Sequence, residues 1–89
     1  MAKPLTSAQI RAARALLRWS AEDLAKQSVL SVATIRRAEL SEDETAMTAA
    51  NNLAVRRALE AAGVVFIEEN GGGAGVRFRH RSSSKGRKS

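Results

Sequence analysis

The chain has 89 residues and a mass of 9.5 kDa, the size of one small domain with a single modest core. It contains no cysteine, which excludes a disulfide framework and a thiolate metal site. The formal net charge is +6, and its distribution is uneven: residues 1–76 carry nine basic and nine acidic side chains, and six more basic side chains follow. A neutral body with a basic end predicts a polyanionic partner.

Nothing in the sequence predicts export or membrane insertion. The start, MAKPLTSAQI, lacks the apolar core of a signal peptide. The longest run of apolar residues and glycine, residues 61–67, is far shorter than the ~20 residues that cross a membrane. We therefore expect a soluble, cytoplasmic protein that makes no contact with membranes.

Three cap motifs in succession predict three short helices. Thr6–Gln9 and Ser20–Asp23 are capping boxes, in which a hydroxyl and a side chain three residues later satisfy free amides at a helix start. Ser31 is a third N-cap. An apolar pair flanks each cap as a hydrophobic staple. The predicted helices cover residues 7–18, 21–28 and 32–40.

The second half of the chain changes from a helical to a strand pattern. Residues 46–62 predict the longest helix, which ends where Gly63 can adopt a left-handed conformation. Residues 64–67 are β-branched and aromatic, and residues 76–79 alternate between apolar and basic, so both predict strands. The glycine-rich stretch between them predicts a hairpin turn. Residues 81–89 have nothing apolar to bury and predict a disordered tail.

The second and third predicted helices are joined by a very short turn, which fits a helix-turn-helix. The strings RAARALLRWSAEDLAKQS and LSVATIRRAE resemble bacterial members of the Cro/repressor-type (XRE-like) helix-turn-helix family, and RRALEAAGVVFIEENGGGAGVRFR is similar to the end of a small one-domain subgroup. The resemblance covers residues 6–79. It implies a mainly α fold, with a four-helix Cro/repressor-like domain and a C-terminal β-hairpin. It also implies that the chain is a DNA-binding transcriptional regulator that acts as a repressor.

The resemblance also implies roles for individual residues. Arg14 and Glu39 match a family pair that fixes the end of the recognition helix to the first helix. Ala25, Leu30 and Ile35 match core positions around the turn. The positions implied to face DNA are Ser31, Val32, Ala33, Thr34, Arg36, Arg37 and, at the start of the second helix, Ala21.

Four features depart from the family pattern. Val29 stands where the turn usually has glycine, so the turn is either reshaped or strained. Ala21 replaces a phosphate-binding glutamine, and Val32 replaces a polar base-reading residue. The loop Glu42–Asp43–Glu44 places three negative charges where the family lies near DNA.

Alternatives remain open for several of these residues. Arg36 and Arg37 could be a solvated helix face, and Arg14 and Glu39 could be independent surface charges. The basic tail could bind DNA nonspecifically or only increase solubility; its cations are Arg81, Lys85, Arg87 and Lys88.

Catalysis has little support in the sequence. The chain has no cysteine or tyrosine, and its one histidine, His80, borders the tail. Residues 82–84 are serines without a partnered base, so acid–base chemistry would rest on scattered carboxylates. We predict no enzymatic activity, no cofactor and no metal site.

These patterns together predict a helix-turn-helix domain over residues 1–63, a dimerising hairpin over 64–80 and a basic tail over 81–89. The predicted function is sequence-specific binding of double-stranded DNA by a homodimer in the nucleoid. Two alternatives are an antitoxin that represses its own operon beside a toxin partner, and a protein-interaction module that has lost operator binding.

Overall fold

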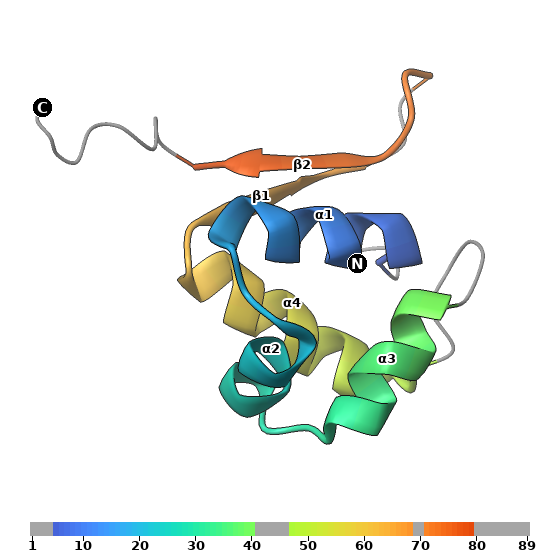
Figure 1. The fold of residues 1–89 in the computed structure, drawn as a ribbon. Coiled ribbons are helices and arrows are strands. Elements are labelled where there is room, and N and C mark those ends of the chain that lie inside the picture. The colour runs from blue at the N-terminus through green and yellow to red at the C-terminus, as the bar shows by residue number, and fades with distance from the viewer. Residues whose placement is uncertain (1–4, 41–46, 69–70, 80–89) are drawn as a thin grey trace, which may run out of the picture.

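The structure is a computed structural model, and it describes residues 5–40, 47–68 and 71–79. The described part contains four helices followed by a two-stranded antiparallel sheet (Figure 1), which confirms the mainly helical fold expected from the sequence. The elements are α1 (Ser7–Leu17), α2 (Ala21–Ser28), α3 (Val32–Leu40), α4 (Ala49–Ala61), β1 (Val64–Ile67) and β2 (Gly75–Phe78).

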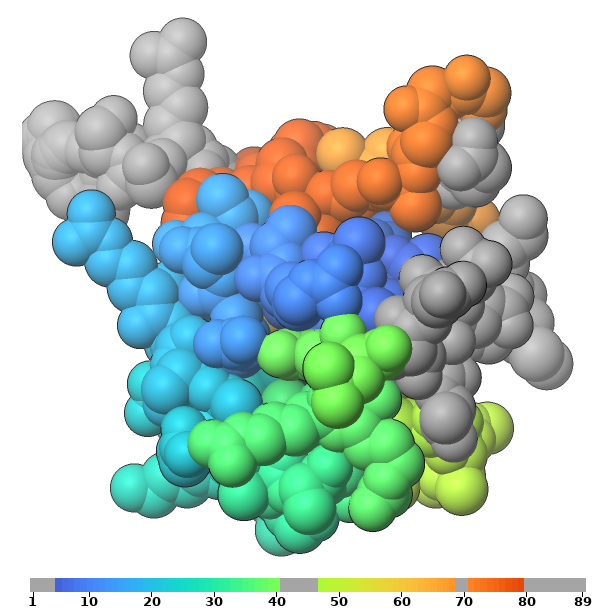
Figure 2. Space-filling model, turned by 45° about the vertical axis from the view of Figure 1, so that its right-hand side comes forward, coloured from blue at the N-terminus to red at the C-terminus, as the bar shows by residue number. Residues whose placement is uncertain are grey.

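The sheet and the α2–α3 pair lie at opposite ends of the molecule (Figure 1). Helix α1 runs between them, directly beneath β2. The space-filling view shows the same order, with the orange strands above the blue α1 and the green α3 below it (Figure 2). A surface on α3 is therefore remote from the hairpin.

The cap motifs start the helices as predicted. At α1, Gln9 N donates to Thr6 Oγ1 at 3.0 Å, and Thr6 N donates to Gln9 Oε1 at 3.0 Å. The Ser20 box at α2 has the same two bonds, at 3.0 and 2.9 Å. At α3, the Ser31 hydroxyl accepts from Thr34 N at 3.1 Å. These bonds satisfy amides that have no partner within the helix.

Helices α1 and α2 end in the same motif, built on residues that rarely adopt it. Arg18 and Val29 both lie in the left-handed region, at φ 58° and 59°. The following amides, Trp19 N and Leu30 N, each donate 2.9 Å bonds to the helix carbonyls of Arg14 and Ala25. This is the Schellman arrangement, in which glycine is the usual left-handed residue. The short turn before α3 is thus kept, with Val29 strained and 87% exposed.

Three elements, α1, α4 and β2, have bounds that differ from the sequence prediction, and α4 also ends one residue earlier than expected, at Ala61. Helix α1 ends at Leu17, because Arg18 turns into the left-handed conformation. Helix α4 begins at Ala49 and not at residue 46, because the Thr48 side chain caps it by accepting from Asn51 N at 3.1 Å. Strand β2 is Gly75–Phe78, one residue earlier than expected. Gly63 has the positive φ that was expected, 105°.

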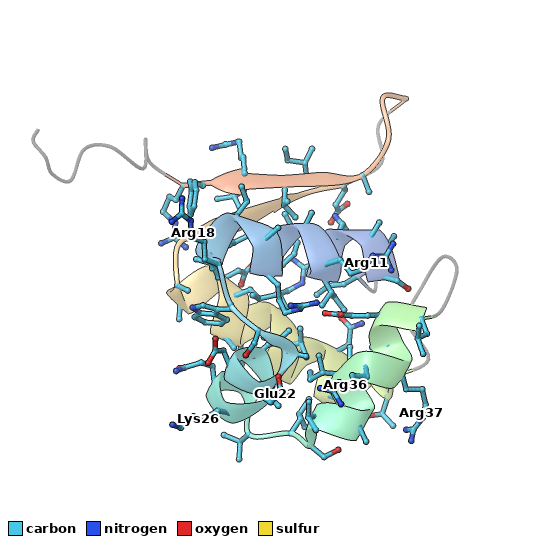
Figure 3. All side chains as sticks on the ribbon, in the orientation of Figure 1. Arg11, Arg18, Glu22, Lys26, Arg36 and Arg37 are labelled. Atoms are coloured by element: carbon cyan, nitrogen blue, oxygen red, sulfur yellow. The ribbon has the colours of Figure 1, made fainter. Side chains whose placement is uncertain are left out.

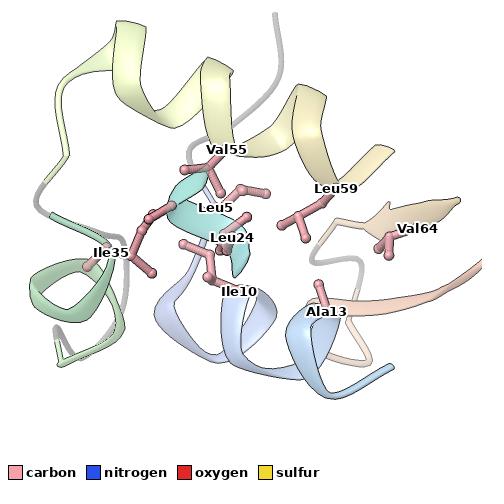
Figure 4. Close-up of a cluster of buried hydrophobic side chains, with 10 residues drawn as sticks. Leu5, Ile10, Ala13, Leu24, Ile35, Val55, Leu59 and Val64 are labelled. Atoms are coloured by element: carbon pink, nitrogen blue, oxygen red, sulfur yellow. The ribbon is translucent and has the colours of Figure 1, made fainter. Parts of the chain in front are cut away.

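The core lies where all four helices and β1 meet (Figure 4). Helices of eight and nine residues, such as α2 and α3, are too short to be stable alone. Each fully buried leucine or isoleucine contributes about 1.5–3 kcal/mol, so packing holds these helices in place. The buried apolar residues are Leu5, Ile10, Ala13, Leu24, Ala25, Ile35, Ala38, Val55, Leu59 and Val64.

The hairpin is attached to α1 by a side chain that also caps that helix. Gln9 Nε2 donates to the carbonyls of Ile67 and Gly75, at 3.2 and 3.1 Å. These two residues are register partners at the turn end of the sheet. Because Gln9 is buried, both bonds are shielded from water. One glutamine therefore fixes the start of α1 and the position of both strands.

The two faces of the sheet have different surroundings. Val64, Phe66 and Val76 point to the helices and join or pack against the core. Val65 and Ile67 alternate to the other face, beside Arg77. No described helix covers that outer face (Figure 1).

Helix α3 is fixed to α1 by a two-bond ion pair. Arg14 Nε and Nη2 donate to the two carboxylate oxygens of Glu39, at 2.7 and 2.9 Å. Arg14 Nη1 donates to the carbonyl of Trp19 at 2.9 Å, and Arg11 donates to the carbonyl of Glu39. The side chains of Arg14 and Glu39 are only 24% and 10% exposed.

The bond to Glu39 is also the main reason that the pKa of Arg14 is raised, although partial burial opposes the shift. A raised pKa means that this stabilisation is fully present below the unfolded-state pKa of arginine. The contribution from the charge of Arg14 is therefore present throughout the neutral range and decreases as the pH rises through the folded-state pKa of Arg14.

Removing either member of the Arg14–Glu39 pair should destabilise the fold. We expect Arg14→Ala and Glu39→Ala each to lower the free energy of unfolding by about 2–3 kcal/mol, because the remaining charge is left partly buried without its partner. Urea denaturation of both single variants and the double variant measures a coupling energy, expected to exceed about 1 kcal/mol. The exposed pair Glu22–Arg36 is the control, with a coupling below about 1 kcal/mol. Equal coupling in the two cycles would contradict the expectation.

Val29→Gly should stabilise the protein. Glycine removes the strain of a β-branched residue at positive φ, worth about 1–2 kcal/mol, and loses part of that gain through its more flexible unfolded chain. We expect a net gain of about 0.5–1 kcal/mol, which is a rise in Tm of about 2–8 °C. Arg18→Gly is the matched control in the same motif and should gain less, since arginine is not β-branched. A lower Tm for Val29→Gly would show that the Val29 side chain contributes more than its strain costs.

Candidate nucleic-acid interface

Helix α3 exposes one stripe of side chains and buries the opposite one. Ile35, Ala38 and Glu39 are buried, whereas Ala33, Arg36, Arg37 and Leu40 are exposed at helical spacing. Two adjacent arginines beside a small residue give a cationic surface that another molecule can approach closely. Such a stripe can donate hydrogen bonds to phosphate or to guanine.

Other residues that were predicted to face DNA lie beside this stripe. Ser31 is exposed, but its hydroxyl accepts from Thr34 N and lies 2.9 Å from Thr34 Oγ1. Thr34 itself is half-buried. Val32 and Ala21 are also half-buried and pack against the core. The accessible part of the predicted set is therefore Ala33, Arg36 and Arg37 on α3, next to the exposed Ser31, whose hydroxyl caps the helix.

Arg36 forms an ion pair with helix α2. Its Nη2 lies 2.6 Å from Glu22 Oε2, and the two side chains are 59% and 62% exposed. Figure 3 shows the two side chains next to one another between α2 and α3, while Arg37 extends away on the far side of α3. Although the two arginines are adjacent in sequence, only Arg36 shares its charge with Glu22.

Sequence reasoning missed this partner of Arg36. Glu22 lies in the first turn of α2, where an acidic residue is common because it interacts favourably with the helix dipole. The two residues are fourteen positions apart, and their meeting depends on the angle between two helices. No local pattern in the sequence encodes that angle.

Other basic side chains lie at different distances from α3. Arg11, within α1, is near the end of α3 and donates to the carbonyl of Glu39. Lys26 lies on α2, and Arg18 lies at the far end of α1, close to the sheet and away from α3 (Figure 3). The carboxylates of Glu22 and Asp23 lie in the first turn of α2.

A shallow pocket of about 130 Å³ lies between α3 and α4. Pockets for drug-sized ligands are usually about 300–1,000 Å³, so this one is small for such a molecule. Its lining residues are Thr34, Arg37, Ala38, Met47, Thr48 and Asn51. Arg37 borders both this pocket and the exposed stripe.

Two predicted features lie outside the described residues. They are the acidic loop at 42–44 and the basic tail with Arg81, Lys85, Arg87 and Lys88, next to His80. Within residues 5–40, 47–68 and 71–79, no three His, Cys, Asp or Glu side chains gather in a way that could hold a metal ion. In the same ranges, no helix combines the length and apolar character needed to span a membrane.

Comparison with known proteins gives no family assignment for this surface. No protein-family model matches the chain, and no curated protein sequence matches it.

Proposed function

We propose that the chain is a sequence-specific DNA-binding regulator of transcription that uses α2 and α3 as a helix-turn-helix. The observation that carries the proposal is the exposed stripe of Ala33, Arg36 and Arg37 on a helix that the Arg14–Glu39 pair holds rigidly. Specific readout needs such rigidity, because base-edge hydrogen bonds require side chains at fixed positions. The Cro/repressor-type resemblance of the sequence points to the same two helices.

The dimensions of α3 fit this role. Its nine residues give a rod about 13.5 Å long, and the major groove is about 12 Å wide, enough to admit a helix. Ala33 lies near the N-terminal end of α3, the end that contacts base edges in helix-turn-helix proteins. A methyl group there permits close approach and can contact a thymine methyl group. Arg36 and Arg37 then lie one turn further along, within reach of phosphate or guanine.

The overall charge supports a nucleic-acid partner. The excess of +6 lies in the last part of the chain, whereas the first 76 residues are neutral. A basic tail can raise affinity for DNA of any sequence by neutralising phosphates. The rigid stripe on α3 would then supply the sequence preference.

A protein-interaction module is the second candidate, and one observation favours it. Two large apolar side chains are exposed near α3: Val29, in the turn before it, by 87%, and Leu40, its last residue, by 83%. Apolar groups in these positions suit a protein partner, as an antitoxin would require.

A binding experiment with genomic DNA separates the two candidates. Fragments captured by the full chain are tested in gel shifts, with and without an excess of random DNA. A regulator retains particular fragments under competition. An interaction module retains none, and that result would overturn the proposal.

Arg37→Ala should weaken binding to a captured fragment by about 1–3 kcal/mol and leave binding to random DNA closer to unchanged, since a base contact is sequence-dependent and a phosphate contact is not. Fluorescence anisotropy on both duplexes measures the difference. Arg57→Ala, which removes one exposed cation from α4, is the matched control. Equal losses on both duplexes would place Arg37 on the phosphate backbone.

We also propose that the regulator is a homodimer formed through the hairpin. A two-stranded sheet is marginal alone, and its outer face carries Val65 and Ile67 without a covering helix. A second copy bound there leaves α3 free, because α3 lies at the opposite end of the molecule (Figure 1).

Ile67→Lys should convert this dimer to a monomer, because it places a charge in the proposed apolar interface. Analytical ultracentrifugation at micromolar concentration measures the change. Leu53→Lys, at an exposed apolar position on α4, should leave the dimer intact. A wild-type chain that stays monomeric even on its specific DNA would contradict the dimer.

A further inference from the structure

We propose that Glu22 reduces the affinity of α3 for phosphate in DNA of any sequence. It does so by neutralising Arg36. This inference rests on the proposed DNA-binding function and assigns a role to a residue on α2 that lies outside the recognition helix.

The geometry of the Glu22–Arg36 pair carries the inference. The two charged groups are 2.6 Å apart, and both side chains are more than half exposed. Glu22 extends from the first turn of α2 to the exposed stripe of α3, so it lies where a DNA strand following that stripe would pass (Figure 3). A phosphate must therefore compete with this carboxylate for the guanidinium of Arg36.

The start of α2 strengthens this competition. The N-terminus of a helix normally attracts anions through its free amides and its dipole. In α2 the Asp23 carboxylate already accepts from Ser20 N, and the Ser20 hydroxyl accepts from Asp23 N. Glu22 adds a second negative charge in the same turn. The two carboxylates therefore repel a phosphate that approaches this end of the helix.

The pair is weak enough to be displaced. Exposed ion pairs contribute little to stability, in contrast to the partly buried Arg14–Glu39 pair. DNA can therefore take Arg36 from Glu22 at a modest cost in affinity. The cost is easiest to measure on random DNA, where binding depends almost entirely on charge. On a cognate site the same cost applies, and base contacts add to the affinity separately.

The test compares Glu22→Gln with a matched charge change elsewhere. Glu68→Gln alters the net charge equally at an exposed position after β1, outside α2 and α3. Binding is measured to a random 20-bp duplex over a range of salt concentrations, and by the salt needed to elute each variant from a heparin column. The basic tail is present in every variant and cancels in the comparison.

We expect Glu22→Gln to bind random duplex about 3- to 5-fold more tightly than wild type. Its slope of log affinity against log salt should be steeper by about 0.9, equal to one added phosphate contact. Glu68→Gln should change affinity by less than about 2-fold. In an Arg36→Gln background, Glu22→Gln should gain no more than Glu68→Gln does, because the released cation is absent.

Several results would overturn the inference. They are an equal gain for Glu22→Gln and Glu68→Gln, a gain that persists without Arg36, and weaker binding by Glu22→Gln, which would make Glu22 a brace for α3. Thermal melts of each variant show whether the fold is intact.

The heparin arm separates the two proposals. If wild type binds no duplex but Glu22→Gln still elutes from heparin at higher salt in an Arg36-dependent way, DNA binding fails, and only the competition of Glu22 with external anions for Arg36 is supported. If no variant binds either polyanion, both fail.

Discussion

Beyond core packing, the orientation of α3 relative to α1 is fixed mainly by one ion pair, between Arg14 of α1 and Glu39 near the end of α3. Helix α3 has only nine residues and could not hold its conformation in isolation. The guanidinium meets the carboxylate through two parallel bonds and also bonds the carbonyl of Trp19, where the chain leaves α1. Because all three nitrogens of the planar guanidinium donate hydrogen bonds, the Arg14 side chain can rotate little. The exposed stripe of α3 therefore moves with α1 as one body.

Helix α1 thus links the two ends of the molecule. Arg14 extends from it to α3, and Gln9 extends from it to the two strands. Both side chains are at least partly buried, so their bonds are protected from competing water. A partner bound to the hairpin and a partner bound to α3 would consequently be held at a fixed distance, with α1 as the spacer. Two recognition helices in one dimer need that fixed distance.

Local interactions explain which features the sequence could predict. Capping boxes, N-caps and the strand pattern act over a few residues, so the helices and the hairpin were predicted to within three residues at each end. The Arg14–Glu39 pair came only from the family resemblance. The two hydrogen bonds from Gln9 to the hairpin join residues 58 and 66 positions apart in the sequence. The Glu22–Arg36 pair depends on the angle between two helices. Neither follows from spacing along the chain.

Two ion pairs of α3 within the described residues have the same chemistry but different roles. Glu39 lies on the buried face of α3, where low exposure to water strengthens its bonds to Arg14, and this pair holds α3 in place. Glu22 lies beside the helix in water, where its bond to Arg36 is weak and an external anion can replace it. Burial decides which carboxylate is structural and which is exchangeable. A surface whose cations were all unopposed would bind any polyanion more tightly. The exchange of Glu22 for phosphate lowers that background affinity, whereas a preference for one sequence has to come from base contacts.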